Sequence, residues 1–164
     1  MTDLNQLADR LAIEHTIKDA ARAFDEKRHV ELMGQAFAEN ARIIYWVRGQ
    51  RSDYSMPNGA LLLKKIHDRC HWTQHLVSPQ VLELNGDTAI ARTPVHALHK
   101  QIRDDGSHNH WIIGAVYEDE LARIDGRWRI TSRKALCAYY EGDLLMKGVK
   151  LFPEKPDLEA GEWA

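Results

Sequence analysis

The sequence lacks the features of secreted, disulfide-stabilised and membrane-spanning proteins. Two cysteines, Cys70 and Cys137, occur in 164 residues, too few for a disulfide framework. No apolar run approaches the roughly twenty residues that cross a bilayer. The first ten residues alternate polar and apolar side chains, without the apolar segment of a signal peptide. We therefore expect a reduced, soluble, cytoplasmic protein.

An excess of charge of either sign is also missing. The chain has 22 lysines and arginines against 24 aspartates and glutamates, and its net charge is −2. Nucleic acids and anionic membranes are bound by clustered basic residues, so neither is an expected partner. Phosphate-binding glycine loops, Gly-x-Ser-x-Gly elbows and dinucleotide fingerprints are absent as well. We expect a small-molecule substrate and no cofactor.

The chain begins with helical patterns. Apolar residues recur every three or four positions from residue 4 to residue 24, which predicts an amphipathic helix capped by Thr2 or Asp3, with Asp25 at the edge of its apolar stripe. The elements expected next are a short helix at 30–37, a strand at 41–47, a loop at 49–58, and a helix at 58–69 with Asn58 as its cap.

From Trp72 onward the pattern is that of a β-meander. Strong turn signals at 85–87, 104–107 and 125–126 separate expected strands at 73–84, 88–102, 109–124 and 127–138. Helices followed by a long antiparallel sheet are typical of an α+β fold in which the helices cover one face of the sheet. We expect a single domain over 1–164, with a curved sheet around a cone-shaped pocket and with 140–164 as a lid or an arm.

His75 and Asp25 are the main candidates for catalysis. A strand can direct His75 inward, and a carboxylate at the end of the first helix can face the same core. An ionised carboxylate that holds one ring nitrogen raises the basicity of the other, which is the arrangement of a general base. The alternatives are a core histidine and a surface aspartate, although the helix dipole disfavours an acidic group at a helix C-terminus.

A second pocket histidine depends on strand register. A two-residue turn at Asn85-Gly86 places His96 opposite His75, whereas a three-residue loop brings His99 to the same face as His75. The spacing does not choose between them. A metal site is a weaker reading of His67, His71 and His75, since no cysteine or carboxylate completes the set at ligand spacing.

Other candidates have ordinary structural alternatives. Tyr45 lies in a strand pattern where a tyrosine packs in a core or directs its hydroxyl into a cavity. Arg133 lies across from Glu118 if the Asp125-Gly126 turn has two residues, which predicts a cross-strand ion pair. Aromatic and apolar side chains that can line a pocket for a ring-shaped substrate are Trp46, Tyr54, Met56, Trp72 and Trp111.

Five segments resemble the SnoaL-like branch of the nuclear-transport-factor-2-like superfamily, cone-shaped α+β proteins that include scytalone dehydratase and hexachlorocyclohexane dehydrochlorinase. The matching segments are 11–13 with Phe24-Asp25, 37–45, Thr73-Gln74-His75 and 124–130. The resemblance implies an aspartate and histidine dyad at Asp25 and His75, a carbonyl-polarising Tyr45, a second pocket histidine at His99, and a pocket arginine at Arg133. It also implies a homo-oligomer, a trimer or otherwise a dimer.

The sequence departs from those enzymes at several positions. Phe24 replaces a tyrosine of the dehydratase, Ala115 and Tyr117 replace its serine and asparagine, and Ala20 replaces a lysine of the dehydrochlorinase. The hypothesis is therefore a cofactor-independent lyase of the dehydratase type for a small, apolar, cyclic or aromatic substrate. Its expected contacts include Phe24 and Tyr117. The alternatives are an isomerase or polyketide cyclase with the same proton transfer, and a non-catalytic binding protein like the small subunits of ring-hydroxylating dioxygenases.

Overall fold

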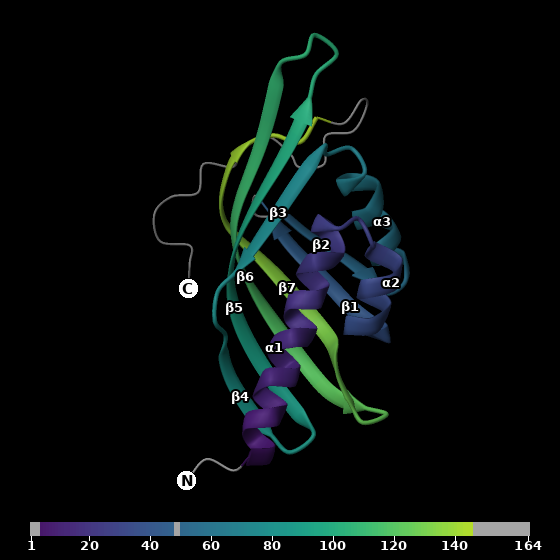
Figure 1. The fold of residues 1–164 in the computed structure, drawn as a ribbon, viewed down its shortest axis with the longest axis vertical. Coiled ribbons are helices and arrows are strands. Elements are labelled where there is room, and N and C mark those ends of the chain that lie inside the picture. Colours follow the sequence, from purple (N-terminus) through teal and green to yellow (C-terminus); the bar gives the residue numbers. More distant parts are fainter. Residues whose placement is uncertain (1–3, 48–49, 146–164) are drawn as a thin grey trace.

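The chain folds in the predicted order, with helices first and a long sheet afterwards (Figure 1). A computed structural model describes residues 4–47 and 50–145. The helices are α1 (Leu4–Asp25), α2 (His29–Ala36) and α3 (Asn58–His67). The strands are β1 (Phe37–Val47), β2 (Gln50–Ser55), β3 (Trp72–Val77), β4 (Val81–Asn85), β5 (Thr88–Ile102), β6 (His108–Ile124) and β7 (Arg127–Gly142).

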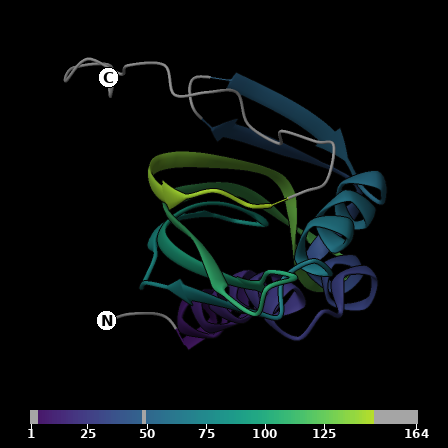
Figure 2. The same cartoon turned by 90° about the horizontal axis from the view of Figure 1, so that it is seen from above.

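All the strands join one mixed sheet in the order β2-β1-β7-β6-β5-β3, with β4 paired to the other end of β5. Strands β1 and β7 run parallel, and the other pairs are antiparallel. The sheet bends strongly but does not close into a barrel, and α2 and α3 lie beside each other at one flank of the bend (Figure 2). The predicted α+β class is confirmed.

Helix α1 packs the second half of its apolar stripe against the sheet. Ile13, Ile17 and Phe24 are almost fully buried, which places the end of the helix, and Asp25 with it, beside the interior. Leu4, at the start of the same stripe, is 80% exposed. The predicted helix is confirmed over Leu4–Asp25, but its first turns lie outside the core, and its expected caps, Thr2 and Asp3, lie outside the described residues.

Several predicted elements differ from the structure, and β1 and β7 are longer than expected. The predicted loop at 49–58 contains β2, an edge strand too polar to show strand periodicity. The strand expected at 73–84 is two strands, β3 and β4, interrupted at 78–80, where Pro79 has no N–H for a sheet hydrogen bond. Asn58 is the first residue of α3 rather than its cap.

The predicted lid or arm at 140–164 lies only partly within the described part of the chain. Strand β7 continues through Gly142, Leu144 is buried, and the backbone N–H of Leu145 donates to Gln101 Oε1 at 2.8 Å. Residues 146–164 lie outside the described residues. No helix in 4–47 or 50–145 combines the length and apolar character of a membrane span.

Candidate active site

A cavity of about 120 Å³ lies between α3, the end of α1 and the concave face of the sheet. Its walls are mainly apolar, with Leu62, Leu63 and Ile66 from α3, and Val95 and Ala97 from β5. Polar groups enter at a few points, which is the usual composition of a small-molecule site. The polar residues among the lining are Tyr45, Ser52, Tyr54, His67, His75, His99, Tyr117 and Cys137.

Asp25 and His75 meet at the edge of this cavity. The ring Nδ1 of His75 lies 2.7 Å from Asp25 Oδ1, and the backbone N–H of His75 donates to Asp25 Oδ2 at 2.8 Å. Strand β3 is fastened to the helix end a second time, by a hydrogen bond of 3.2 Å from Thr73 Oγ1 to the Phe24 carbonyl. The predicted contact is confirmed.

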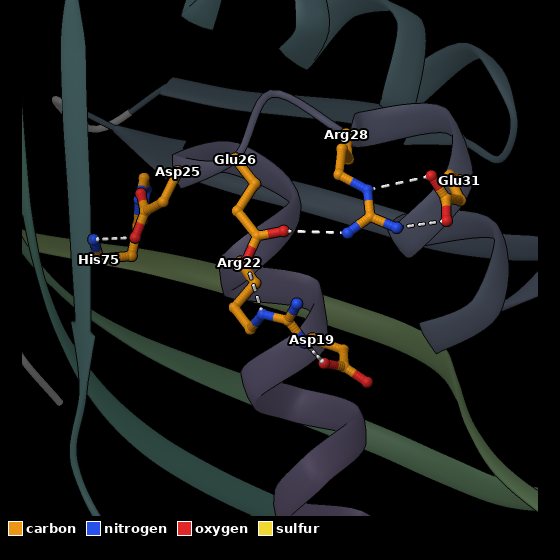
Figure 3. A network of polar contacts seen from close by, with 7 residues as sticks. All are labelled: Asp19, Arg22, Asp25, Glu26, Arg28, Glu31 and His75. Atoms are coloured by element: carbon orange, nitrogen blue, oxygen red, sulfur yellow. Dashed lines mark hydrogen bonds and ion pairs between the residues drawn. The ribbon is translucent and has the colours of Figure 1, made fainter.

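The direction of the Asp25 side chain is visible in Figure 3. Asp25 turns toward β3, whereas Arg22, Glu26 and Arg28 form a chain of exposed ion pairs on another side of the helix end. A carboxylate can only accept hydrogen bonds, so His75 Nδ1 carries the proton of this contact. Because the His75 side chain is 4% exposed and lines the cavity, its Nε2 is the nitrogen left to meet a bound molecule.

Two more histidines lie beside His75. His99 faces the cavity from β5, and its ring centroid is 5.4 Å from that of His75. His67, the last residue of α3, has its ring centroid 5.7 Å from that of His75. Burial lowers the pKa of His99 to about 3 and that of His67 well below its ordinary value, so both rings are neutral at pH 7.

The register question is answered in favour of His99. His75 pairs with Ala97, so His99, two residues further, shares its face, whereas His96 pairs with Leu76 and is exposed. This is the register that a three-residue loop would give. It arises instead from a two-residue Gly86-Asp87 turn and one extra residue in the interruption between β3 and β4.

Tyr45 and Tyr117 face the cavity from β1 and β6, which are separated by β7 in the sheet. Enclosure among the pocket walls raises the pKa of Tyr45 well above its ordinary value and that of Tyr117 to about 12. Both hydroxyls therefore keep their protons and can donate hydrogen bonds to a substrate oxygen. The expected positions of these residues, and of Phe24 and Tyr54, in the pocket are confirmed.

Arg133 lies behind the pocket wall rather than in the lining. Its Nε and one terminal nitrogen donate to Asp119 at 2.7 and 2.8 Å, with both side chains almost fully buried, and its guanidinium lies 4.3 Å from the Tyr117 ring centroid. The prediction that Arg133 pairs with Glu118 is wrong. The turn has two residues as expected, but a bulge between β6 and β7 shifts the register by one residue beyond Leu121.

Trp46 and Trp72 do not line the pocket, contrary to expectation. They are 40% and 45% exposed, because side chains alternate along a strand and Tyr45 and Thr73 take the inward positions. The histidine set considered for a metal also differs. His71 turns away and accepts a hydrogen bond from the Ile102 backbone N–H at 3.2 Å, and His99 takes its place beside His67 and His75.

Residues 5–134, most of the chain, match the family model described as a SnoaL-like domain. The chain belongs to the SnoaL-like family. It is 27% identical over 150 residues to gamma-hexachlorocyclohexane dehydrochlorinase of Sphingobium indicum, which covers 85% of this chain and 87% of that enzyme. This relationship places the chain in a family that includes lyases.

Solved structures agree with the fold. The hexachlorocyclohexane dehydrochlorinase LinA type 2 matches with a TM-score of 0.71 at 24% identity, over 93% of this chain and 99% of that chain. A scytalone dehydratase-like protein from Novosphingobium aromaticivorans matches with a TM-score of 0.73 at 19% identity, over 86% of this chain and 91% of that chain. The resemblance drawn from the sequence is confirmed at the level of family and fold.

Proposed function

We propose that this protein is a lyase in which His75, held by Asp25, removes a proton from a small apolar substrate, and that the elimination releases water without a cofactor. The observation that carries the proposal is the 2.7 Å contact between Asp25 Oδ1 and His75 Nδ1 at the wall of an apolar cavity. The relationship to a dehydrochlorinase supports elimination chemistry. A non-catalytic binding protein is less consistent with this cavity and contact, since that alternative predicts a filled cone or an Asp25 and His75 that do not touch.

The reaction balances within the site. His75 Nε2 takes a proton from a carbon next to a carbonyl or another activating group, and the C–H electron pair forms a double bond as the C–O bond to the leaving hydroxyl breaks. The departing hydroxide takes the same proton back from His75 and leaves as water. Tyr45 and Tyr117 donate hydrogen bonds to the oxygen on which charge develops.

The tautomer of His99 leaves His75 as the residue that returns the proton to the leaving group. His99 Nδ1 lies 3.1 Å from the Trp111 carbonyl oxygen, which can only accept, so the proton is on Nδ1 and Nε2 presents a lone pair. A neutral ring in this tautomer has no proton to give to a leaving group in the cavity. The expected acid role of His99 therefore passes to His75, and His99 orients the substrate hydroxyl by accepting its hydrogen bond.

The test is a panel of small cyclic hydroxyketones that carry deuterium at the carbon to be deprotonated, with products followed by mass spectrometry. Elimination predicts loss of one water that contains the deuterium. His75→Gln and Asp25→Asn are expected to lower kcat by about a hundredfold to ten-thousandfold, the usual contribution of a positioned base. His96→Gln, on the outer face of β5, is the matched control with wild-type activity.

Two results would contradict the proposal. Full turnover in His75→Gln or Asp25→Asn would remove the dyad from the mechanism. A product of unchanged molecular formula, with the deuterium moved or exchanged for solvent hydrogen, would identify an isomerase instead.

A further inference from the structure

The three histidines at the cavity come from three separate elements and form a nearly equilateral triangle. Their ring centroids lie 5.7 Å apart for His67 and His75, 5.5 Å for His67 and His99, and 5.4 Å for His75 and His99. One ring nitrogen of each residue lies within 4.8 Å of one from each of the others. The proposed proton transfer uses His75 and accounts for His99, but it gives no role to His67.

In each ring Nδ1 is the nitrogen that contacts an acceptor oxygen. His75 Nδ1 contacts the Asp25 carboxylate at 2.7 Å, His99 Nδ1 contacts the Trp111 carbonyl at 3.1 Å, and His67 Nδ1 contacts the Leu63 carbonyl at 2.8 Å. Carboxylate and carbonyl oxygens only accept hydrogen bonds, so each Nδ1 carries a proton and each Nε2 presents a lone pair. His29 Nε2, 3.0 Å from His67 Nδ1, accepts a share of the same proton.

The three Nε2 lone pairs are therefore left for a ligand at the cavity, and no N–H of the three rings is left to donate to them. Imidazole nitrogens that converge in this way, each with its N–H bonded to a carbonyl or carboxylate, have the first and outer shells of a metal site. We propose that His67, His75 and His99 bind one divalent transition-metal ion through Nε2, and that the bound ion blocks proton abstraction by His75.

The ligand set restricts the ion. Three neutral imidazoles suit Zn²⁺, Co²⁺, Ni²⁺ or Cu²⁺, whereas Mg²⁺ and Ca²⁺ prefer oxygen ligands. Zn–N bonds of about 2.05 Å at tetrahedral angles place ligand nitrogens about 3.3 Å apart, so the rings must move inward by about an ångström or less each. The cavity side leaves room for a fourth ligand, as in catalytic zinc sites.

The inhibitory part of this inference rests on the proposed function, because a coordinated His75 Nε2 has no lone pair for a substrate proton. The binding part rests on geometry alone. The two are therefore tested by separate readouts, metal binding without substrate and turnover with and without metal.

The binding experiment uses the untagged full chain after chelator treatment, titrated with Zn²⁺ by calorimetry and with Co²⁺ by visible absorption. The expected result is one ion per chain and the intense d–d bands of tetrahedral Co²⁺. His67→Gln and His99→Gln should each weaken Zn²⁺ binding at least about a hundredfold, since loss of an outer-shell partner alone costs about 10–100-fold. Asp25→Asn should fall within that smaller range.

The matched control is His96→Gln, which removes a histidine from β5, the strand of His99, but on its outer face. This variant should bind Zn²⁺ as the wild type does. Equal binding in His67→Gln, His99→Gln and the wild type, or no binding by a folded wild type, would overturn the site. Two variants on different elements, checked by circular dichroism, separate ligand loss from misfolding.

The inhibition experiment then compares turnover of the chelated enzyme with and without one equivalent of Zn²⁺. The expected result is loss of activity that chelator restores and that His67→Gln prevents. Stoichiometric binding with undiminished turnover would sustain the metal site and overturn His75 as the base. Turnover that depends on Asp25 and His75, with no metal binding, would support His75 as the base and overturn the metal site.

Discussion

The carboxylate of Asp25 holds His75 at two points, through the backbone N–H at 2.8 Å and the ring Nδ1 at 2.7 Å. One group therefore fixes both the position of β3 against the end of α1 and the tautomer of the ring. Asp25 accepts both hydrogen bonds, whereas the His75 side chain takes part in only one of them. Substitutions of Asp25 and of His75 should therefore have different effects on stability.

Asp25→Asn should lower both activity and stability, because an amide offers one acceptor oxygen to two N–H donors and presents its own NH₂ to the other. A donor left unsatisfied in a partly buried site costs roughly 1–3 kcal/mol. His75→Gln keeps the backbone bond to Asp25 and should be closer to wild-type stability. Urea unfolding checks the order. Asp19→Asn, in an exposed ion pair on the same helix, is the control, and equal stability of Asp25→Asn and Asp19→Asn would contradict the prediction.

The buried pair of Arg133 and Asp119 makes a second prediction about stability. Removal of one partner leaves an uncompensated buried charge, so Arg133→Met should cost about 3–5 kcal/mol of unfolding free energy. The double variant Arg133→Met with Asp119→Leu should recover a large part of that loss. Chemical denaturation of the singles and the double measures the coupling between them.

An exposed ion pair between β5 and β6 provides the control for these single and double variants. Arg92 and Glu118 lie 3.6 Å apart, with the Arg92 side chain 62% exposed, so Arg92→Met should cost less than about 1 kcal/mol. A loss for Arg133→Met no larger than that for Arg92→Met would show that the buried pair contributes no more than a surface pair.

The sequence pattern made Asp25 and His75 candidates, and the family resemblance implied that they form a dyad. The stripe of α1 ends at Asp25, and the alternation of β3 directs Thr73 and His75 to one side. The same reasoning missed His67 as a pocket residue. His67 lies on the buried face of α3 with Ala60 and Leu63, but helical spacing does not distinguish a core histidine from one that lines a pocket.

Long-range register was the other limit. Turn chemistry at Asp125-Gly126 correctly predicted a two-residue hairpin, yet the partner of Arg133 was displaced by a bulge further along β6 and β7. His99 lies on the same face as His75 because one extra residue near Pro79 shifts the register between β4 and β3, and not because of the loop length at the turn. Bulges are selected by tertiary packing of the whole sheet, so local sequence does not report them.

The stability of the fold should depend on pH through Asp9. Hydrogen bonds from Arg123 and then Trp128 lower the pKa of Asp9 from its ordinary value of 3.8. The folded chain therefore binds this proton less readily than the unfolded chain, and the contribution is complete above about pH 4 and is lost as the pH falls through the folded-state pKa.

The stability difference between the wild type and Asp9→Asn should accordingly stay constant from about pH 7 to 5 and shrink below about pH 4. Thermal unfolding across this range measures it. Asp87→Asn is the control, since Asp87 contacts the same arginine but its side chain is 79% exposed. A difference that grows in acid would contradict the assignment.

Tyr45 is expected to act through its hydroxyl, because enclosure raises its pKa well above the ordinary value and keeps the proton available for donation. Tyr45→Phe retains the ring and removes the donor, so kcat should fall by about a hundredfold, the usual effect of losing one donor to a developing oxyanion. KM should change little, since the bond strengthens mainly in the transition state. Tyr54→Phe, in the same pocket on edge strand β2, should keep the wild-type kcat. Equal losses in both variants would mean that the hydroxyls shape the cavity rather than stabilise charge.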